Sequence, residues 1–157
     1  DESGSMLPSI IHSAVMAGIF AKLPMLTTHL VIFDTAVVDL TGRMDDPVET
    51  LMSVHLGGGT DIAKAMGYCK ALITAPRRTI VVLVSDLCEG GSRQSLYRTC
   101  HDIVESGARL IALTALNEHS VPDYDRATAQ TLADLGAHVG AMTPERLADF
   151  MAGIMQK

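Results

Sequence analysis

The sequence lacks the residue clusters that mark several common functional classes. It has no run of Lys and Arg, and its formal net charge is -6. Because proteins bind phosphate backbones through clustered basic side chains, we do not expect nucleic acid as a partner. The three cysteines form no Cys-x-x-Cys pair and the six histidines show no zinc-ligand spacing. These features are typical of reduced thiols in a cytosolic protein.

Long apolar segments are also missing. No apolar run approaches the roughly 18 residues that a membrane-spanning helix needs, and we find no pattern of a secretory signal peptide. We therefore expect a cytoplasmic protein with no membrane partner. Apolar residues make up 48% of the 157 residues and charged residues 19%, which is a globular composition and a length that fits one domain with a full core.

Apolar periodicity predicts an alternation of helices and strands along the chain. We expect helices at residues 6–22, 46–53, 62–74, 93–106, 122–135 and 143–155, and strands at residues 29–34, 37–40, 79–85, 109–116 and 137–140. The first two strands are expected to form a hairpin. The later alternation predicts an α/β fold, a Rossmann-like three-layer sandwich with a mostly parallel sheet and helices on both faces.

The first six residues, Asp1 to Met6, read Asp-Glu-Ser-Gly-Ser-Met. They offer a carboxylate and two hydroxyls at alternating positions, Asp1, Ser3 and Ser5, and Gly4 permits a sharp turn between the serines. Hard oxygen ligands suit Mg²⁺, Mn²⁺ or Ca²⁺. Ser and Asp are also preferred helix N-caps, so capping of the following helix is an open alternative at this point.

Two later stretches provide further oxygen ligands at related places. The glycine turn Gly57-Gly58-Gly59 delivers the hydroxyl of Thr60 just before a predicted helix, and the apolar strand that begins at Thr79 ends in Asp86. Three glycines could instead bind a phosphate, but no Gly-Lys-Ser/Thr follows them, which disfavours a P-loop. In parallel α/β sheets ligands bind at the carboxyl ends of the strands, where all these residues are expected.

This order of motifs, Asp-x-Ser-x-Ser, then Gly-x-Thr, then an apolar strand ending in Asp, resembles the metal-ion-dependent adhesion site of von Willebrand factor A (VWA) domains. The resemblance covers nearly the whole chain, and the stretch from Ser85 to Gly91 is similar to the bacterial CoxE-like branch. Many members have Gly directly after the aspartate, where this chain has Leu87. The resemblance implies one antiparallel edge strand and a Mg²⁺ ion, with Mn²⁺ or Ca²⁺ as alternatives, held by Asp1, Ser3, Ser5, Thr60 and Asp86.

The family resemblance also implies a function. One metal position is expected to stay open for an Asp or Glu of a partner protein, so the chain is expected to be a protein-binding module and not an enzyme. The CoxE-like branch implies a bacterial cytoplasmic protein that works beside a MoxR-type AAA+ ATPase in complex assembly or metal-cofactor insertion. Related domains occur in magnesium and cobalt chelatase subunits. The family's central strand would precede Asp1, so we expect a single VWA domain, residues 1–157, cut from a longer protein.

A metal-assisted hydrolase is the competing class, because a metal with open positions can activate water. His55 near the second motif is interpreted as a surface histidine, and for Cys88 the sequence shows no histidine partner. Glu89 is interpreted as part of a solvated turn, with a contact at the rim of the site as the alternative. Asp34 and Asp39 are expected to be turn and edge carboxylates rather than ligands. A degenerate, purely structural site is disfavoured because all five ligand positions carry side-chain oxygens.

Overall fold

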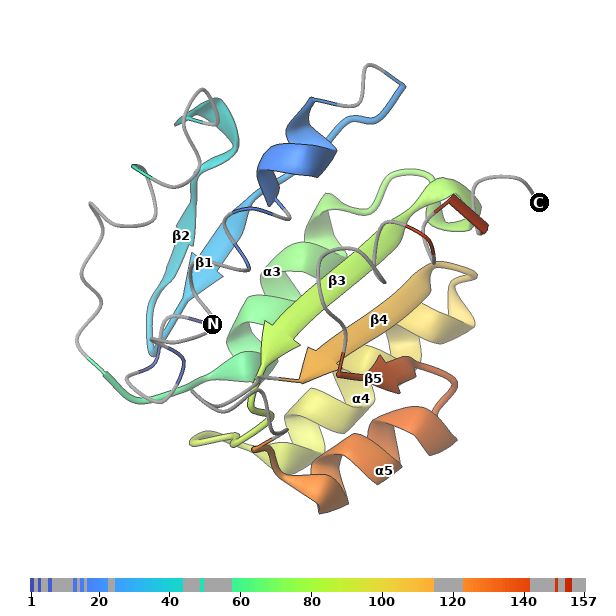
Figure 1. The fold of residues 1–157 in the computed structure, drawn as a ribbon. Coiled ribbons are helices and arrows are strands. Elements are labelled where there is room, and N and C mark those ends of the chain that lie inside the picture. The colour runs from blue at the N-terminus through green and yellow to red at the C-terminus, as the bar shows by residue number, and fades with distance from the viewer. Residues whose placement is uncertain are drawn as a thin grey trace.

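The strands form two sheets in the computed structural model of the protein, which describes residues 1, 3, 6, 13, 15, 17–22, 25–43, 49, 58–114, 123–141, 149 and 152–153. Strands β1 (Val31–Phe33) and β2 (Val37–Asp39) pair antiparallel. Strands β3 (Ile80–Ser85), β4 (Arg109–Thr114) and β5 (His138–Gly140) form a parallel sheet in that order (Figure 1). The predicted hairpin and the predicted parallel pairing of the later strands are both confirmed.

The turn of the hairpin is fixed by Asp34. Asp34 is buried, and its Oδ1 accepts a hydrogen bond from the main-chain N–H of Ala36 at 2.6 Å. Asp39 at the end of β2 similarly accepts bonds from the N–H and hydroxyl of Thr41, the first residue of a 3-10 helix (Thr41–Arg43). Asp34 is therefore a turn carboxylate and Asp39 an edge carboxylate, as the sequence predicted.

The helices that follow the hairpin in the described part of the chain each begin after a residue whose side chain accepts a main-chain hydrogen bond. Helix α3 (Ile62–Leu72) is capped by Asp61, and α4 (Arg93–Glu105) by Ser92. Helix α5 (Arg126–Asp134) is capped by Asp125, so it begins later than the predicted start at residue 122. A short 3-10 helix, Pro76–Arg78, leads from α3 into β3.

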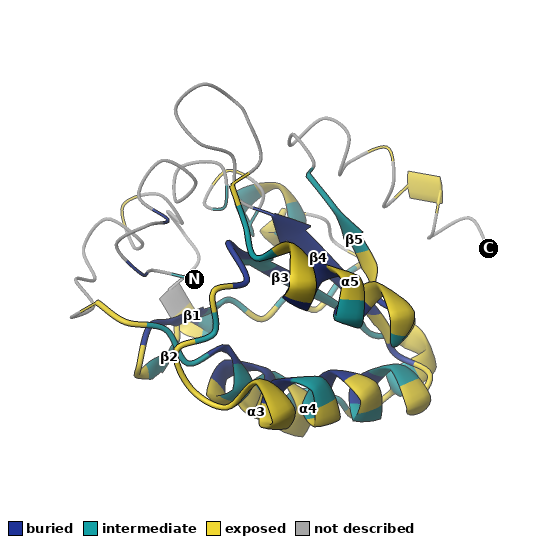
Figure 2. Ribbon diagram, turned by 90° about the horizontal axis from the view of Figure 1, so that it is seen from below, coloured by how far each residue is buried: buried dark blue, intermediate teal, exposed yellow. Residues whose placement is uncertain are grey.

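The main core lies between the strands and these helices. Figure 2 shows α3 and α4 side by side on one side of the sheet, with β4 buried at its centre. Phe33 of β1 and Leu83 of β3 belong to the same buried cluster as Ile62 and Met66 of α3, so α3 packs against both sheets. On the opposite face Phe20, from the helical residues 17–21, packs against the cluster of Ile111 and Leu113. Helices therefore cover both faces, as expected.

Within the described residues β1 and β3 are not paired with each other, because they belong to separate sheets. The central strand that we expected before Asp1 stays a prediction. Some predictions lie outside the described residues. They concern most of the helices at residues 46–53 and 143–155, and also Ser5, His55 and Gly57. Among the helices that are described, none has the length and apolar character required to cross a membrane.

Candidate metal centre

Asp86 lies directly after β3 and is 7% exposed. Its Oδ1 accepts a hydrogen bond from the main-chain N–H of Cys88 at 2.9 Å, so the loop's own backbone orients the carboxylate. Its main-chain carbonyl accepts a bond from the N–H of Asp125 at 2.9 Å, which attaches the loop to the start of α5. A buried carboxylate is costly unless donors or a cation compensate its charge, and these contacts hold it at the carboxyl edge of the sheet.

Leu87, the next residue, has a left-handed backbone with φ of 61°. This conformation costs a residue with a Cβ about 1–2 kcal/mol, and Gly adopts it freely. The Leu87 side chain is fully buried, and its main-chain N–H donates to Ser85 Oγ at 3.0 Å. The loop therefore has a backbone shape that favours Gly while a buried leucine side chain occupies the position.

Ser85 connects this loop to the first motif. Its Oγ donates a hydrogen bond to Asp1 Oδ2 at 2.5 Å, and the main-chain N–H of Ser3 donates to Asp1 Oδ1 at 3.0 Å. Both serines are buried. The sequence interpretation missed Ser85 as a site residue; its position directly before Asp86 in a parallel strand was the available signal.

Thr60 lies in a turn that is fixed on two sides. Gly58 and Gly59 have φ of 84° and 93°, which only glycine adopts without strain, and the N–H of Asp61 donates to Asp34 O at 2.8 Å. The main-chain carbonyl of Thr60 accepts a hydrogen bond from the N–H of Gly90 at 3.0 Å. The second and third motifs are thus in direct contact.

Three segments distant in sequence therefore meet at the carboxyl edge of the parallel sheet, through the contacts Asp1–Ser85 and Thr60–Gly90. Four of the five predicted ligands, Asp1, Ser3, Thr60 and Asp86, are described and belong to these segments; Ser5 is not described. Among the described residues no three His, Cys, Asp or Glu side chains gather into a metal-binding group. The predicted set contains only two carboxylates, so ligation by all five residues stays a prediction.

The chemistry of this edge fits a hard divalent cation. Its side-chain donors are carboxylate and hydroxyl oxygens, the ligands that Mg²⁺ takes in proteins. Thr114 pairs with Ser85 in the sheet register, and its hydroxyl is buried with no hydrogen-bond partner in the described part of the chain. Buried hydroxyls are normally satisfied, so this one fits an edge where a further polar ligand or water belongs.

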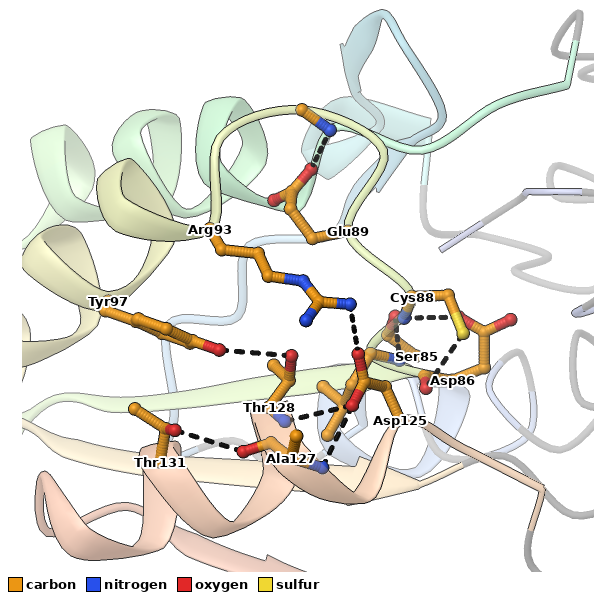
Figure 3. A network of polar contacts seen from close by, with 12 residues as sticks. Ser85, Asp86, Cys88, Glu89, Arg93, Tyr97, Asp125, Ala127, Thr128 and Thr131 are labelled. Atoms are coloured by element: carbon orange, nitrogen blue, oxygen red, sulfur yellow. Dashed lines mark hydrogen bonds and ion pairs between the residues drawn. The ribbon is translucent and has the colours of Figure 1, made fainter.

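A polar network continues from Asp86 toward α5 (Figure 3). Asp125 Oδ1 accepts hydrogen bonds from the N–H groups of Ala127 and Thr128, and Arg93 donates to its Oδ2 at 2.6 Å. The main-chain N–H of Thr128 first, and the Arg93 charge in addition, lower the pKa of the Asp125 carboxyl. The start of α5 is therefore stabilised by an ionised cap.

Cys88 does not have the environment of a nucleophile. Its thiol donates to the main-chain carbonyl of Asp86, with a sulfur–oxygen distance of 3.7 Å. Partial burial, and then the nearby Asp86 charge, raise the pKa of the thiol. A catalytic cysteine needs a lowered pKa, so this environment disfavours the thiolate. All three cysteines are free thiols, as the sequence predicted.

Glu89 corrects one sequence interpretation. We expected a solvated turn, but the side chain is half-buried and its Oε2 accepts a hydrogen bond from the main-chain N–H of Ala63 at 2.8 Å. Its Oε1 accepts from the N–H of Gly91 at 2.6 Å. The carboxylate therefore binds the first turn of α3, a contact across 26 residues that local sequence patterns do not reveal.

The arrangement of sheet and helices defines a VWA-like α/β fold, and solved structures share it. The similar chains include BatB from Bacteroides thetaiotaomicron (TM-score 0.71, 12% identity, covering 100% of this chain and 96% of that chain). An aerotolerance-related membrane protein from Bacteroides fragilis NCTC 9343 has a TM-score of 0.68 at 14% identity, covering 90% of this chain and 88% of that one. A von Willebrand factor type A protein from Catenulispora acidiphila has a TM-score of 0.66 at 19% identity, covering 98% of this chain and 40% of that one.

Residues 1–151 match the family described as VWA domain containing CoxE-like protein, and the chain belongs to that family. A curated relative, the uncharacterized protein YehP of Escherichia coli (strain K12), is 51% identical over 156 residues. The match covers 99% of this chain but only 41% of that relative, so the chain spans less than half of its length. The resemblance noted from the sequence is confirmed at the level of fold and family.

Proposed function

We propose that this domain is a protein-binding module that depends on a divalent metal. The observation that carries the proposal is the meeting of three segments, those of Asp1, Thr60 and Asp86, at the carboxyl edge of the sheet. These segments bring oxygen donors of the type that Mg²⁺ prefers, with few carboxylates among them. In the proposal Asp1, Ser3, Ser5, Thr60 and Asp86 form the metal-ion-dependent adhesion site, with Mn²⁺ or Ca²⁺ as alternative ions.

The proposed partner is a protein that presents an Asp or Glu side chain. When bound, the ion supplies a Lewis-acid centre that accepts one further oxygen ligand. Three of the five proposed ligands are neutral hydroxyls, so much of the ion's charge is left uncompensated, and an incoming carboxylate is a favourable ligand. Membership of the CoxE-like family supports a MoxR-type AAA+ ATPase as this partner, in the bacterial cytoplasm, during complex assembly or metal-cofactor insertion.

A binding role is favoured over the alternative of a metal-assisted hydrolase. Cys88 has a raised pKa, and its thiol donates to the Asp86 carbonyl. The carboxylate of Glu89 is occupied by two main-chain N–H groups. Neither residue is therefore prepared to serve as nucleophile or general base. The second alternative is a domain similar to those of chelatase subunits. Such a domain would use the same carboxyl edge of the sheet and would also act by binding a partner protein.

The proposal is tested by changing Asp86 alone. Asp86→Asn retains an oxygen that can accept the Cys88 N–H bond but removes the charge. We expect titration calorimetry with Mg²⁺ or Mn²⁺ to give a saturable binding curve for the parent and none for the variant. Binding of a purified MoxR-type ATPase from the same organism should require Mg²⁺, be abolished by EDTA and be lost in Asp86→Asn.

The control is thermal unfolding of both proteins without metal, which should be similar because the loop keeps its hydrogen bond. If Asp86→Asn binds metal like the parent, or unfolds in metal-free buffer, Asp86 is structural and the assignment is wrong. Hydrolysis of model esters or phosphates that depends on Mg²⁺ and on Asp86 would instead favour the enzyme.

A further inference from the structure

Two ligand-bearing segments are joined by contacts that involve none of the predicted ligand side chains. They are the Asp86 loop, residues 86–91, and the Thr60 turn, residues 58–61. Glu89 of the Asp86 loop accepts hydrogen bonds through both carboxylate oxygens, from Gly91 N at 2.6 Å within its own loop (Figure 3) and from Ala63 N at 2.8 Å in the first turn of α3, the helix that begins where the Thr60 turn ends. One side chain thus connects both segments.

Gly90, the following residue, makes a second connection. Its main-chain N–H donates to Thr60 O at 3.0 Å. A Cβ added to Gly90 would lie 2.6 Å from that same carbonyl oxygen, closer than such atoms approach in proteins. Only glycine therefore permits the two backbones to lie this close. The side chain of Glu89 and the backbone of Gly90 hold the two segments together from adjacent positions.

The bond to Ala63 also completes the start of α3. The first N–H groups of a helix have no partner within the helix, and a negative charge near them is favourable. Asp61 accepts the N–H of Lys64, and Glu89 accepts the N–H of Ala63. Helix α3 therefore begins with one partner from its own segment and one from the Asp86 loop, so the position of Thr60 depends on that loop.

We propose that Glu89 is a positioning residue that fixes the Asp86 loop relative to the Thr60 turn, so that the oxygens of both segments are prepared for one ion. The part that concerns the ion rests on the proposed function. The coupling of the two segments rests only on the hydrogen bonds of Glu89 and Gly90. Residues that orient metal ligands without touching the metal commonly change its affinity when they are replaced.

The test compares Glu89→Ala, Glu89→Gln and the control Ser92→Ala. Ser92 lies three residues after Glu89 and caps α4 by accepting a hydrogen bond from Ser95 N. Replacing Ser92 therefore removes a helix cap close to Glu89 but leaves the contacts of the Thr60 turn intact. We expect Glu89→Ala to weaken Mg²⁺ binding in calorimetry about 10–100-fold. Glu89→Gln should lie between Glu89→Ala and the parent, because an amide has one acceptor oxygen for two N–H groups. Ser92→Ala should bind Mg²⁺ like the parent.

Amide hydrogen exchange without metal gives a second, independent measurement. In Glu89→Gln, the N–H groups of Ala63 and Gly90 should exchange faster together, while those of β4 stay protected. Unchanged Mg²⁺ affinity in both Glu89 variants, or an equal loss in Ser92→Ala, would overturn the positioning role. If the parent itself binds no Mg²⁺, the proposed function fails, and hydrogen exchange decides the coupling. Faster exchange on both sides supports it, whereas faster exchange confined to residues 89–91 contradicts it.

Discussion

Leu87 shows how one residue stores strain beside the candidate site. Its φ of 61° favours glycine, yet its side chain is fully buried in the main core. Strained backbone at such a place persists only when surrounding interactions compensate for it, and burying a leucine provides about 1.5–3 kcal/mol. A glycine and this leucine would therefore be two solutions for the same turn, the glycine without backbone strain and the leucine with a better-packed core.

This balance gives an order of stabilities for substitutions at Leu87. Leu87→Ala loses the buried side chain and keeps the backbone strain, whereas Leu87→Gly loses the side chain and relieves the strain. We expect the free energy of unfolding to fall by about 2–5 kcal/mol in Leu87→Ala, and by about 1 kcal/mol less in Leu87→Gly. Chemical denaturation of the three proteins measures the order. An alanine variant at least as stable as the glycine variant would show that the turn is unstrained.

Thr60 allows binding of metal and of partner to be separated. Thr60→Ala removes one neutral oxygen and leaves both candidate carboxylates, Asp1 and Asp86. We expect a small loss of Mg²⁺ affinity and a larger loss of affinity for an acidic partner. The turn should survive, because its contacts with Gly90 and Asp34 use main-chain atoms. Calorimetry with Mg²⁺, followed by partner titration at saturating Mg²⁺, measures both. Equal partner affinity of variant and parent would contradict the role.

At the scale of elements, sequence patterns predicted the first residue of a helix correctly where a neighbouring side chain caps it. Asp61 and Ser92 begin α3 and α4 as predicted, because each lies directly before an apolar periodic segment and no nearer cap competes. For α5 the predicted start at residue 122 is wrong, because the helix begins at Arg126. The structure uses Asp125 as the cap, and its N–H is bound by the carbonyl of Asp86. That start depends on a tertiary contact, which local patterns do not contain.

The same distinction applies to the site. Motif order and the rule that ligands gather at the carboxyl edge of parallel strands predicted that the segments of Asp1, Thr60 and Asp86 meet there, and the structure brings these segments together, whereas their ligation of a metal stays a prediction. Glu89 and Ser85 were missed as site residues, since their roles depend on hydrogen bonds to segments 26 and 84 residues away. Asp86 directly follows an apolar strand and can therefore be identified locally, whereas the hydrogen bonds of Glu89 and Ser85 connect segments that are far apart in the sequence.

The cap of α5 provides a prediction at this scale. Asp125→Ala should reduce the free energy of unfolding at neutral pH by about 0.5–2 kcal/mol, the usual cost of losing an N-cap. Folding lowers the pKa of the Asp125 carboxyl below the ordinary value of an aspartate, chiefly through the hydrogen bond from the Thr128 N–H. The ionised cap therefore stabilises the fold above that value, and its contribution is lost as the pH falls through the folded pKa.

Denaturation curves of parent and Asp125→Ala at several pH values measure this effect. The two proteins should differ most near neutral pH and converge in acid. Asp125→Asn is the matched control, because an amide oxygen still caps the helix but carries no charge, and it should show a smaller pH dependence than the parent. A difference between parent and Asp125→Ala that is constant from neutral to acid pH would show that the charge makes no contribution.

For the whole molecule, the separate sheets matter to any measurement of stability. β1 and β3 are not joined to each other by hydrogen bonds in the described part of the chain, and α3 packs against both. Two of the candidate ligands belong to segments that contact different sheets: Asp1 accepts a hydrogen bond from Ser85 at the end of β3, while the segment of Thr60 contacts Asp34 in the β1–β2 turn. An ion bound by all three segments would therefore connect the two sheets.

A bound ion should accordingly stabilise the entire fold, since it binds the native state only. Stabilisation follows RT ln(1 + [L]/Kd), about 2.7 kcal/mol at a hundredfold excess over Kd, which for a domain of this size corresponds to about 5–10 °C in Tm. We expect Tm to rise with millimolar Mg²⁺ or Mn²⁺ and to return to the starting value with EDTA. KCl at matched ionic strength and the Asp86→Asn variant serve as controls, and neither should show the rise. If Tm is the same with and without the divalent ion, or if Asp86→Asn responds like the parent, the three segments do not hold a metal together.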